Sequence, residues 1–69
     1  MRNHVREHRS QAGMTQADLA AAVGVSRQTV ISIESGRYLP SLPLAFRLAR
    51  LFGIALEQLF ELSDEELAL

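Results

Sequence analysis

Side chains that form paired hydrogen bonds stand next to each other near the middle of the sequence. Arg27 and Gln28 are adjacent, and Ile31 follows within one helical turn. Arginine donates two parallel hydrogen bonds to a guanine edge, glutamine exchanges two with an adenine, and an apolar side chain touches a thymine methyl group. This chemistry suits the reading of bases in a DNA major groove. The same residue types are also ordinary on an exposed helix face, and Ile31 can equally be a half-buried packing residue.

A second pattern that could support catalysis or metal binding lies near the N-terminus, where His4, Glu7 and His8 match the spacing H-x-x-E-H. In inverted zinc proteases this motif supplies two zinc-binding histidines and a glutamate base. A catalytic zinc also needs a third protein ligand and a substrate cleft. A chain of 69 residues has little room for either once its helices are packed. We therefore interpret both histidines as surface or partly buried side chains, and we expect no catalytic residue, no bound metal and no cofactor.

The elements that must position these side chains are short helices, separated by glycine, proline and cap residues. Apolar residues recur in them at helical spacing, and no stretch alternates as a strand does. The predicted helices cover residues 2–12, 16–23, 27–35, 42–52 and 56–61. Thr15, Ser26 and Ser41 precede three of these helices as N-cap residues, and Asp18 completes a capping box with Thr15. Ala55 precedes the fifth helix and is a poor cap.

The second and third of these helices are joined by a tight turn. Gly24 supplies the positive φ that such a turn needs, and Ala20 is small enough for the two helices to cross closely. Val30 and Ile33 lie on one face of the third helix, where they anchor it to the core. The opposite face, which carries Arg27, is therefore expected to point outward.

Charge is divided unevenly along the chain, although the net charge is only −1. All seven basic residues are arginines within residues 1–50, which hold three acidic residues, whereas residues 51–69 hold five acidic residues and no basic one. A cationic body attracts phosphate through its basic face even when an acidic tail lowers the net charge. Arginine suits bidentate contacts to phosphate or guanine better than lysine does. A compositional bias of the source organism would also explain why every basic residue is an arginine.

The composition also indicates the cellular compartment in which we expect the protein. The chain has no cysteine, so neither a disulfide framework nor a thiolate metal site is available. No apolar run approaches the roughly 18 residues of a membrane span, and residues 1–4 lead into charged residues rather than a signal-peptide core. We therefore expect a cytoplasmic protein with no membrane partner. A domain of this size commonly covers its remaining apolar surface by oligomerisation.

Four runs of sequence stand out: Thr15-Gln16-Ala17-Asp18-Leu19-Ala20, Gly24-Val25-Ser26-Arg27-Gln28-Thr29-Val30, Ile33-Glu34-Ser35-Gly36-Arg37-Tyr38 and Pro40-Ser41-Leu42. Together they resemble the XRE (Cro/CI-type) helix-turn-helix family, in particular its short single-domain transcriptional regulators. The resemblance covers roughly residues 1–61. It implies an all-α, compact five-helix, lambda-repressor-like DNA-binding domain over residues 1–62, with an acidic C-terminal tail over residues 63–69. The second and third helices would form the helix-turn-helix, and the protein would not be an enzyme.

The resemblance also assigns roles to individual positions of this chain. The residues expected to read bases lie at the start and on the outer face of the third helix: Arg27, Gln28, Ile31 and Ser32. The residues expected to contact the DNA backbone flank them: Thr15, Gln16, Ser26, Thr29, Ser35, Arg37 and Tyr38. Arg9 and Glu34 match a structural ion pair between the first and third helices. His8 departs from the family pattern, because leucine is common at its position.

The function that this resemblance implies is sequence-specific transcriptional regulation, with repression by occlusion of a promoter as the expected mode. The expected partners are double-stranded DNA and a second copy of the chain. Leu56, Phe60 and Leu62 provide more apolar surface than one small core readily covers, although some apolar residues of this region must close the monomer core. A two-fold dimer through these residues would place two recognition helices about 34 Å apart on a palindromic operator.

The same fold also serves as the antitoxin of a toxin–antitoxin pair or as a protein-interaction module, which is the alternative interpretation. Residues 63–69 are the part of the chain left for such a partner. Leu67 and Leu69 lie among acidic residues there, so the segment is a partner-binding arm, one further capped helical turn or a disordered end. A toxin gene beside the coding gene would favour the antitoxin role.

Overall fold

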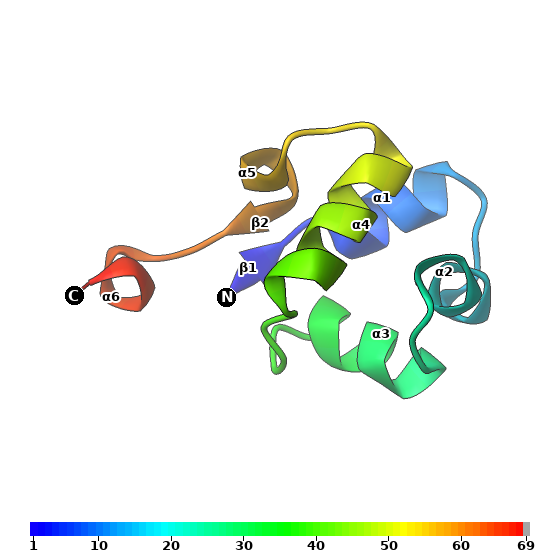
Figure 1. The fold of residues 1–69 in the computed structure, drawn as a ribbon, viewed down its shortest axis with the longest axis horizontal. Coiled ribbons are helices and arrows are strands. Elements are labelled where there is room, and N and C mark those ends of the chain that lie inside the picture. Colours follow the sequence, from blue (N-terminus) through cyan, green and yellow to red (C-terminus); the bar gives the residue numbers. More distant parts are fainter. Residues whose placement is uncertain (69) are drawn as a thin grey trace.

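The structure, a computed structural model, describes residues 1–68 (Figure 1). These residues form six helices and two strands of two residues each. In chain order the elements are β1 (Arg2–Asn3), α1 (Val5–Gln11), α2 (Gln16–Val23), α3 (Arg27–Glu34), α4 (Leu42–Phe52), α5 (Leu56–Leu59), β2 (Phe60–Glu61) and α6 (Asp64–Leu67). None of these helices is long and apolar enough to cross a membrane. Leu69, the last residue of the predicted acidic tail, lies outside the described residues.

One hydrophobic core lies where helices α1 to α5 meet. Each of these helices contributes at least one fully buried side chain: Val5, Leu19, Val30, Ile33, Leu48 and Leu59. In Figure 1, α4 crosses the middle of the molecule with α3 below it, and α6 stands apart from this group. His8 stacks on Phe52 at the edge of the core, with ring centroids 5.6 Å apart. The departure from the family pattern at His8 therefore adds an aromatic contact between α1 and α4.

The start of α2 is held by a reciprocal pair of hydrogen bonds. The Thr15 hydroxyl accepts a hydrogen bond from the Asp18 backbone N–H at 3.0 Å, and the Asp18 carboxylate accepts one from the Thr15 N–H at 2.9 Å. The predicted capping box is therefore confirmed. The bond from the Thr15 backbone is the main reason that the pKa of Asp18 lies below its usual value. At the other end of α2, Gly24 adopts the predicted left-handed conformation, with φ of +75°.

Helices α3 and α4 both start from serine caps. The Ser26 hydroxyl accepts a hydrogen bond from the Thr29 N–H at 3.1 Å, and the Ser41 hydroxyl accepts one from the Leu44 N–H at 3.3 Å. Ser35 is the C-terminal cap of α3 rather than its last helical residue. The predicted bounds of these two helices are therefore confirmed to within one residue.

The N-terminus departs from the prediction. The helix predicted from residue 2 begins at Val5, and Arg2–Asn3 form a strand instead. The Asn3 side chain explains the difference, because its Oδ1 accepts a hydrogen bond from the Val5 N–H at 3.1 Å and its Nδ2 donates one to the Ile33 carbonyl at 2.9 Å. β1 also pairs antiparallel with β2. The all-α expectation therefore holds except for this two-stranded pair, which ties the start of the chain to Phe60–Glu61, while the Asn3 side chain ties it to the end of α3.

The fifth helix is shorter than predicted. It ends at Leu59 rather than at Glu61, because Phe60 and Glu61 extend to pair with β1. Ala55 provides no side-chain cap at its start. The Gln58 side chain makes half of a capping box instead, because its Oε1 accepts a hydrogen bond from the Ala55 N–H at 2.9 Å.

The predicted acidic tail begins with one capped helical turn, α6. The Ser63 hydroxyl accepts a hydrogen bond from the Glu66 N–H at 3.2 Å, and the Glu66 carboxylate accepts one from the Ser63 N–H at 2.9 Å. The bond from the Ser63 backbone is the main reason that the pKa of Glu66 lies below its usual value. Glu66 also pairs with the Met1 ammonium at 3.2 Å. Of the three interpretations of this segment, the structure contains the capped turn.

Candidate nucleic-acid interface

Helix α3 has a buried inner face and an exposed outer face. Val30 and Ile33 retain only 1% and 2% of their surface in solvent, and they hold the back of the helix against the core. Arg27 and Gln28 lie exposed. Burial of each of the two apolar side chains is worth roughly 1.5–3 kcal/mol, so the helix strongly prefers this orientation. The outer face therefore presents a guanidinium and an amide group to solvent.

The predicted backbone-contacting residues at the end of α3 lie close together. The Ser32 carbonyl accepts hydrogen bonds from the Arg37 and Tyr38 N–H groups, at 3.0 and 3.2 Å, and from the Ser35 hydroxyl at 3.0 Å. These bonds fold the turn after α3 back onto the helix. Ser35, Arg37 and Tyr38 are exposed there, whereas Ser32 and Ile31 are half-buried.

The remaining predicted backbone contacts gather at the starts of α2 and α3. Gln16 is the first residue of α2, and Thr29 lies in the first turn of α3 with its hydroxyl 2.9 Å from that of Ser26. The Thr15 hydroxyl accepts a hydrogen bond as the α2 cap. It keeps its O–H proton for an acceptor such as a phosphate oxygen.

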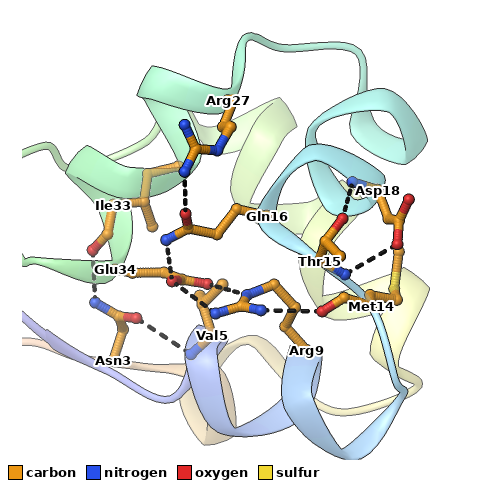
Figure 2. Close-up of polar contacts among 10 residues, drawn as sticks. All are labelled: Asn3, Val5, Arg9, Met14, Thr15, Gln16, Asp18, Arg27, Ile33 and Glu34. Atoms are coloured by element: carbon orange, nitrogen blue, oxygen red, sulfur yellow. Dashed lines mark hydrogen bonds and ion pairs between the residues drawn. The ribbon is translucent and has the colours of Figure 1, made fainter.

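A chain of four polar side chains runs from α1 to the outer face of α3 (Figure 2). Arg9 Nε donates a hydrogen bond to Glu34 Oε2 at 2.7 Å, and Arg9 Nη2 donates one to Glu34 Oε1 at 3.3 Å. Gln16 Nε2 donates to the same Oε1 atom at 3.1 Å. Gln16 Oε1 accepts a longer hydrogen bond from Arg27 Nη2, at 3.4 Å. The ion pair inside the protein is thereby linked to an arginine on the exposed face.

The Arg9–Glu34 pair is largely removed from solvent, because only 13% and 6% of the two side chains are exposed. Arg9 Nη1 also donates a hydrogen bond to the Met14 carbonyl at 2.9 Å. The hydrogen bond to Glu34 is the main reason that the pKa of Arg9 is raised above its usual value. The pair joins α1 to α3 and holds the segment that leads into α2.

Glu34 also fixes the orientation of the Gln16 amide. A carboxylate only accepts hydrogen bonds, so the NH₂ group of Gln16 must face Glu34 and its carbonyl oxygen must face away from it. A guanidinium only donates, so Arg27 is a fitting partner for that oxygen. Glu34 therefore determines which end of Gln16 meets Arg27, an arrangement that sequence spacing alone did not predict.

The three residues predicted at a dimer interface line one apolar groove of about 220 Å³. Leu56 and Phe60 are half-buried there, and Leu62 is exposed. Sequence reasoning missed the other residues of the groove: Leu39, Pro40, Leu42 and Ala45. Phe46 is 54% exposed and lines a neighbouring hollow that shares Leu56. Leu42 and Phe46 are four residues apart on α4, so helical spacing could have identified this second apolar stripe.

The two histidines of the H-x-x-E-H pattern make separate contacts. His4 Nε2 pairs with the Glu61 carboxylate beside the β1–β2 pair, whereas His8 stacks on Phe52. Within residues 1–68, no group of three histidine, cysteine, aspartate or glutamate side chains is placed to hold a metal ion. The geometry therefore gives the zinc-protease pattern no support.

Comparison with protein families and sequences gives one consistent result. A family model described as helix-turn-helix matches residues 5–59. An HTH-type transcriptional regulator from Archaeoglobus fulgidus is 51% identical over 67 residues, which cover 97% of this chain and 96% of the relative. A second one, from Methanothermobacter thermautotrophicus, is 52% identical over 66 residues, which cover 94% of this chain and 96% of the relative.

A solved structure is similar as well. The restriction-modification controller protein C.AhdI from Aeromonas hydrophila superposes with a TM-score of 0.74 and 33% sequence identity. The superposition covers 83% of this chain and 86% of C.AhdI. The predicted lambda-repressor-like helix-turn-helix architecture is therefore confirmed, as a mostly helical small domain.

Proposed function

Because this chain belongs to the XRE (Cro/CI-type) helix-turn-helix family of DNA-binding transcriptional regulators, we propose that it is a sequence-specific repressor which binds a palindromic operator as a homodimer. The observation that carries the proposal is the orientation of α3. Its buried Val30 and Ile33 turn Arg27 and Gln28 toward solvent. An exposed helix face with paired hydrogen-bonding groups fits the major groove of B-DNA.

In this proposal the outer face of α3 reads the bases. Arg27 contacts a guanine, and Gln28 contacts an adenine or braces Arg27. Ile31 and Ser32 lie deeper on the same face, where Ile31 meets a thymine methyl group. Each paired contact is worth about 1–3 kcal/mol of discrimination against a wrong base. The 3.4 Å contact between Arg27 and Gln16 is long, so Arg27 gives it up for a base edge at little cost.

Contacts to the DNA backbone hold this helix in the groove and supply most of the salt-dependent affinity. One set lies at the starts of α2 and α3: Thr15, Gln16, Ser26 and Thr29. The other set lies in the turn after α3: Ser35, Arg37 and Tyr38. Because the two sets stand at opposite ends of α3, they suit the two sugar–phosphate strands that border a major groove.

The partner that we propose for the apolar groove is a second copy of this chain. Leu39 and Leu42 are 56% and 64% exposed at its rim, and contiguous apolar patches of this kind mark interaction sites. A two-fold axis lets the same patch serve both copies. The groove is lined in part by Leu56, Phe60 and Leu62. These residues belong to a stretch, residues 51–68, that carries five acidic residues and no basic one, so this part of the molecule is better suited to protein contact than to DNA.

A dimer on DNA represses by occupying a promoter. Occlusion needs nothing beyond stable binding at the right site. The exposed face of α3 and the apolar groove that we propose as the dimer interface are sufficient for this simple mode of action.

Selection of bound duplexes from a random DNA pool tests the proposal. The selected duplexes are expected to share a two-fold-symmetric site whose half-sites are centred about 34 Å apart, which is one turn of the DNA helix. Enrichment of a single asymmetric half-site would contradict the homodimer, and no enrichment would contradict sequence-specific regulation. A reporter gene behind the selected site should then lose expression when the protein is present, whereas increased expression would contradict the repressor role.

A further inference from the structure

We propose that Arg6, on α1, contacts the DNA phosphate backbone beside the reading helix, so that the DNA-binding surface extends onto the first helix. This inference rests on the proposed DNA-binding function. The backbone-contacting residues expected from the sequence all lie between Thr15 and Tyr38, and none of them is on α1.

The first observation is an open cleft of about 670 Å³ between α1, α2 and α3. Arg6 lines it from α1, whereas Arg27 and Ser35 line it from α3, and both arginines are exposed. Arg27 also belongs to the outer face of α3. The cleft therefore opens beside the surface that enters the major groove.

The second observation is the balance of charge inside the cleft. Its lining contains three arginines and one carboxylate, that of Glu34. Arg9 forms an ion pair with Glu34 and donates a further hydrogen bond to the Met14 carbonyl, so this pair is neutral as a unit. Arg6 and Arg27 then give the cleft its net positive charge.

The third observation is that no polar partner within the described part of the protein holds the Arg6 side chain. Within residues 1–68 its side chain forms no ion pair and accepts or donates no hydrogen bond. Its acidic neighbour Glu7 points away, because consecutive helical residues face directions about 100° apart, and Glu7 does not line the cleft. An exposed guanidinium in a positive cleft is a good ligand for a phosphate oxygen.

The phosphate backbone, rather than a base, is the ligand that fits this position. Arg6 stands on α1 and the base-reading residues stand on α3, and both helices line the cleft. In this proposal a sugar–phosphate strand that borders the groove occupied by α3 passes the α1 side of the cleft, and backbone contacts position a protein without reading sequence. Arg6 should therefore add affinity and salt dependence without changing the preferred site.

The salt dependence of binding tests the inference, with a short duplex that carries the selected operator. The logarithm of the binding constant falls with the logarithm of salt concentration, by about 0.9 for each phosphate neutralised. Arg6→Gln should reduce the magnitude of this slope by about 0.9. When the salt concentration rises from about 50 to about 200 mM, the loss of affinity should therefore be roughly threefold smaller for the variant than for the wild type. Arg6→Lys should restore most of the slope, because it keeps the charge.

Arg2→Gln is the matched control, since Arg2 is exposed and lies in another hollow together with Glu61 and Glu66. It should leave the slope unchanged, and all three variants should unfold at the wild-type temperature. An unchanged slope for Arg6→Gln, with a wild type that binds the duplex, would overturn this inference alone. A wild type that binds no duplex at low salt would overturn the proposed function together with it.

Discussion

At the scale of single residues, Glu34 is the group on which the polar chain behind the reading helix depends. Arg9 and Gln16 both donate hydrogen bonds to its carboxylate. Only 6% of the Glu34 side chain is exposed, so water cannot easily replace it. Without any acceptor at this position, Arg9 would keep only the Met14 carbonyl as a partner, and Gln16 would lose the constraint on its amide.

Glu34→Gln should therefore lower the free energy of unfolding by about 3 kcal/mol, because it leaves a largely buried guanidinium without its counter-charge. Urea denaturation followed by circular dichroism measures the change. Glu7→Gln, which neutralises an exposed carboxylate on α1, should stay within about 0.5 kcal/mol of the wild type. Equal losses for the two variants would show that the ion pair contributes nothing beyond an ordinary surface charge.

At the scale of secondary-structure elements, the start of α2 is both a stabilising cap and part of the proposed DNA interface. Thr15 and Asp18 satisfy each other's backbone N–H groups there, and Gln16 follows the cap directly. The lowered pKa of Asp18 means that its carboxylate stabilises the folded state most fully above the pKa of the unfolded chain. This contribution is at full strength at neutral pH and is lost as the pH falls below about 4.

Thr15→Ala should cost about 1 kcal/mol of unfolding free energy at neutral pH, because one N–H group at the start of α2 loses its acceptor. Thermal or urea unfolding provides the measurement. Ser10→Ala removes an exposed hydroxyl within α1 and serves as the control. If both alanine variants matched the wild type, the cap would have no energetic role.

At the scale of the whole molecule, the apolar groove is the surface that we propose as the dimer interface. Leu42→Asp places a charge at its rim, on a side chain that is already 64% exposed, so the fold should survive. We expect this variant to be a monomer by light scattering at a micromolar concentration where the wild type is a dimer. It should also bind the palindromic operator more weakly, since one half-site is lost.

Leu51→Asp provides the comparison for this substitution. Leu51 is 44% exposed on the same helix but does not line the groove, so its variant should remain dimeric. A wild type that stays monomeric both alone and on its operator would contradict the dimer. If both variants are dimeric, the dimer interface lies elsewhere than at the groove.

The parts of the fold that depend on neighbouring residues could be predicted from the sequence. A cap or a left-handed glycine acts within about one helical turn, so Thr15 and Gly24 indicated where α2 begins and ends, and Ser26 indicated where α3 begins. The spacing of Val30 and Ile33 likewise predicted which side of α3 is buried. These local features determine the orientation of the reading helix.

The parts that depend on distant residues could not be predicted in this way. The two-residue strands show no alternation, and their pairing joins Arg2 to Glu61 near opposite ends of the chain. Asn3 stops α1 from starting earlier through a bond to Ile33, thirty residues away. Arg6 and Arg27 likewise line one cleft only because α1 packs against α3.

The most direct test of the account is the base discrimination of Arg27→Ala, compared with that of the wild type on the selected operator and on its single base-pair substitutions. The side chain is exposed on α3, so its removal should leave the fold intact. We predict that the variant loses about 1–3 kcal/mol of discrimination at one G·C pair in each half-site and keeps its preferences elsewhere. Uniform weakening on every duplex, with all preferences intact, would contradict base reading by α3.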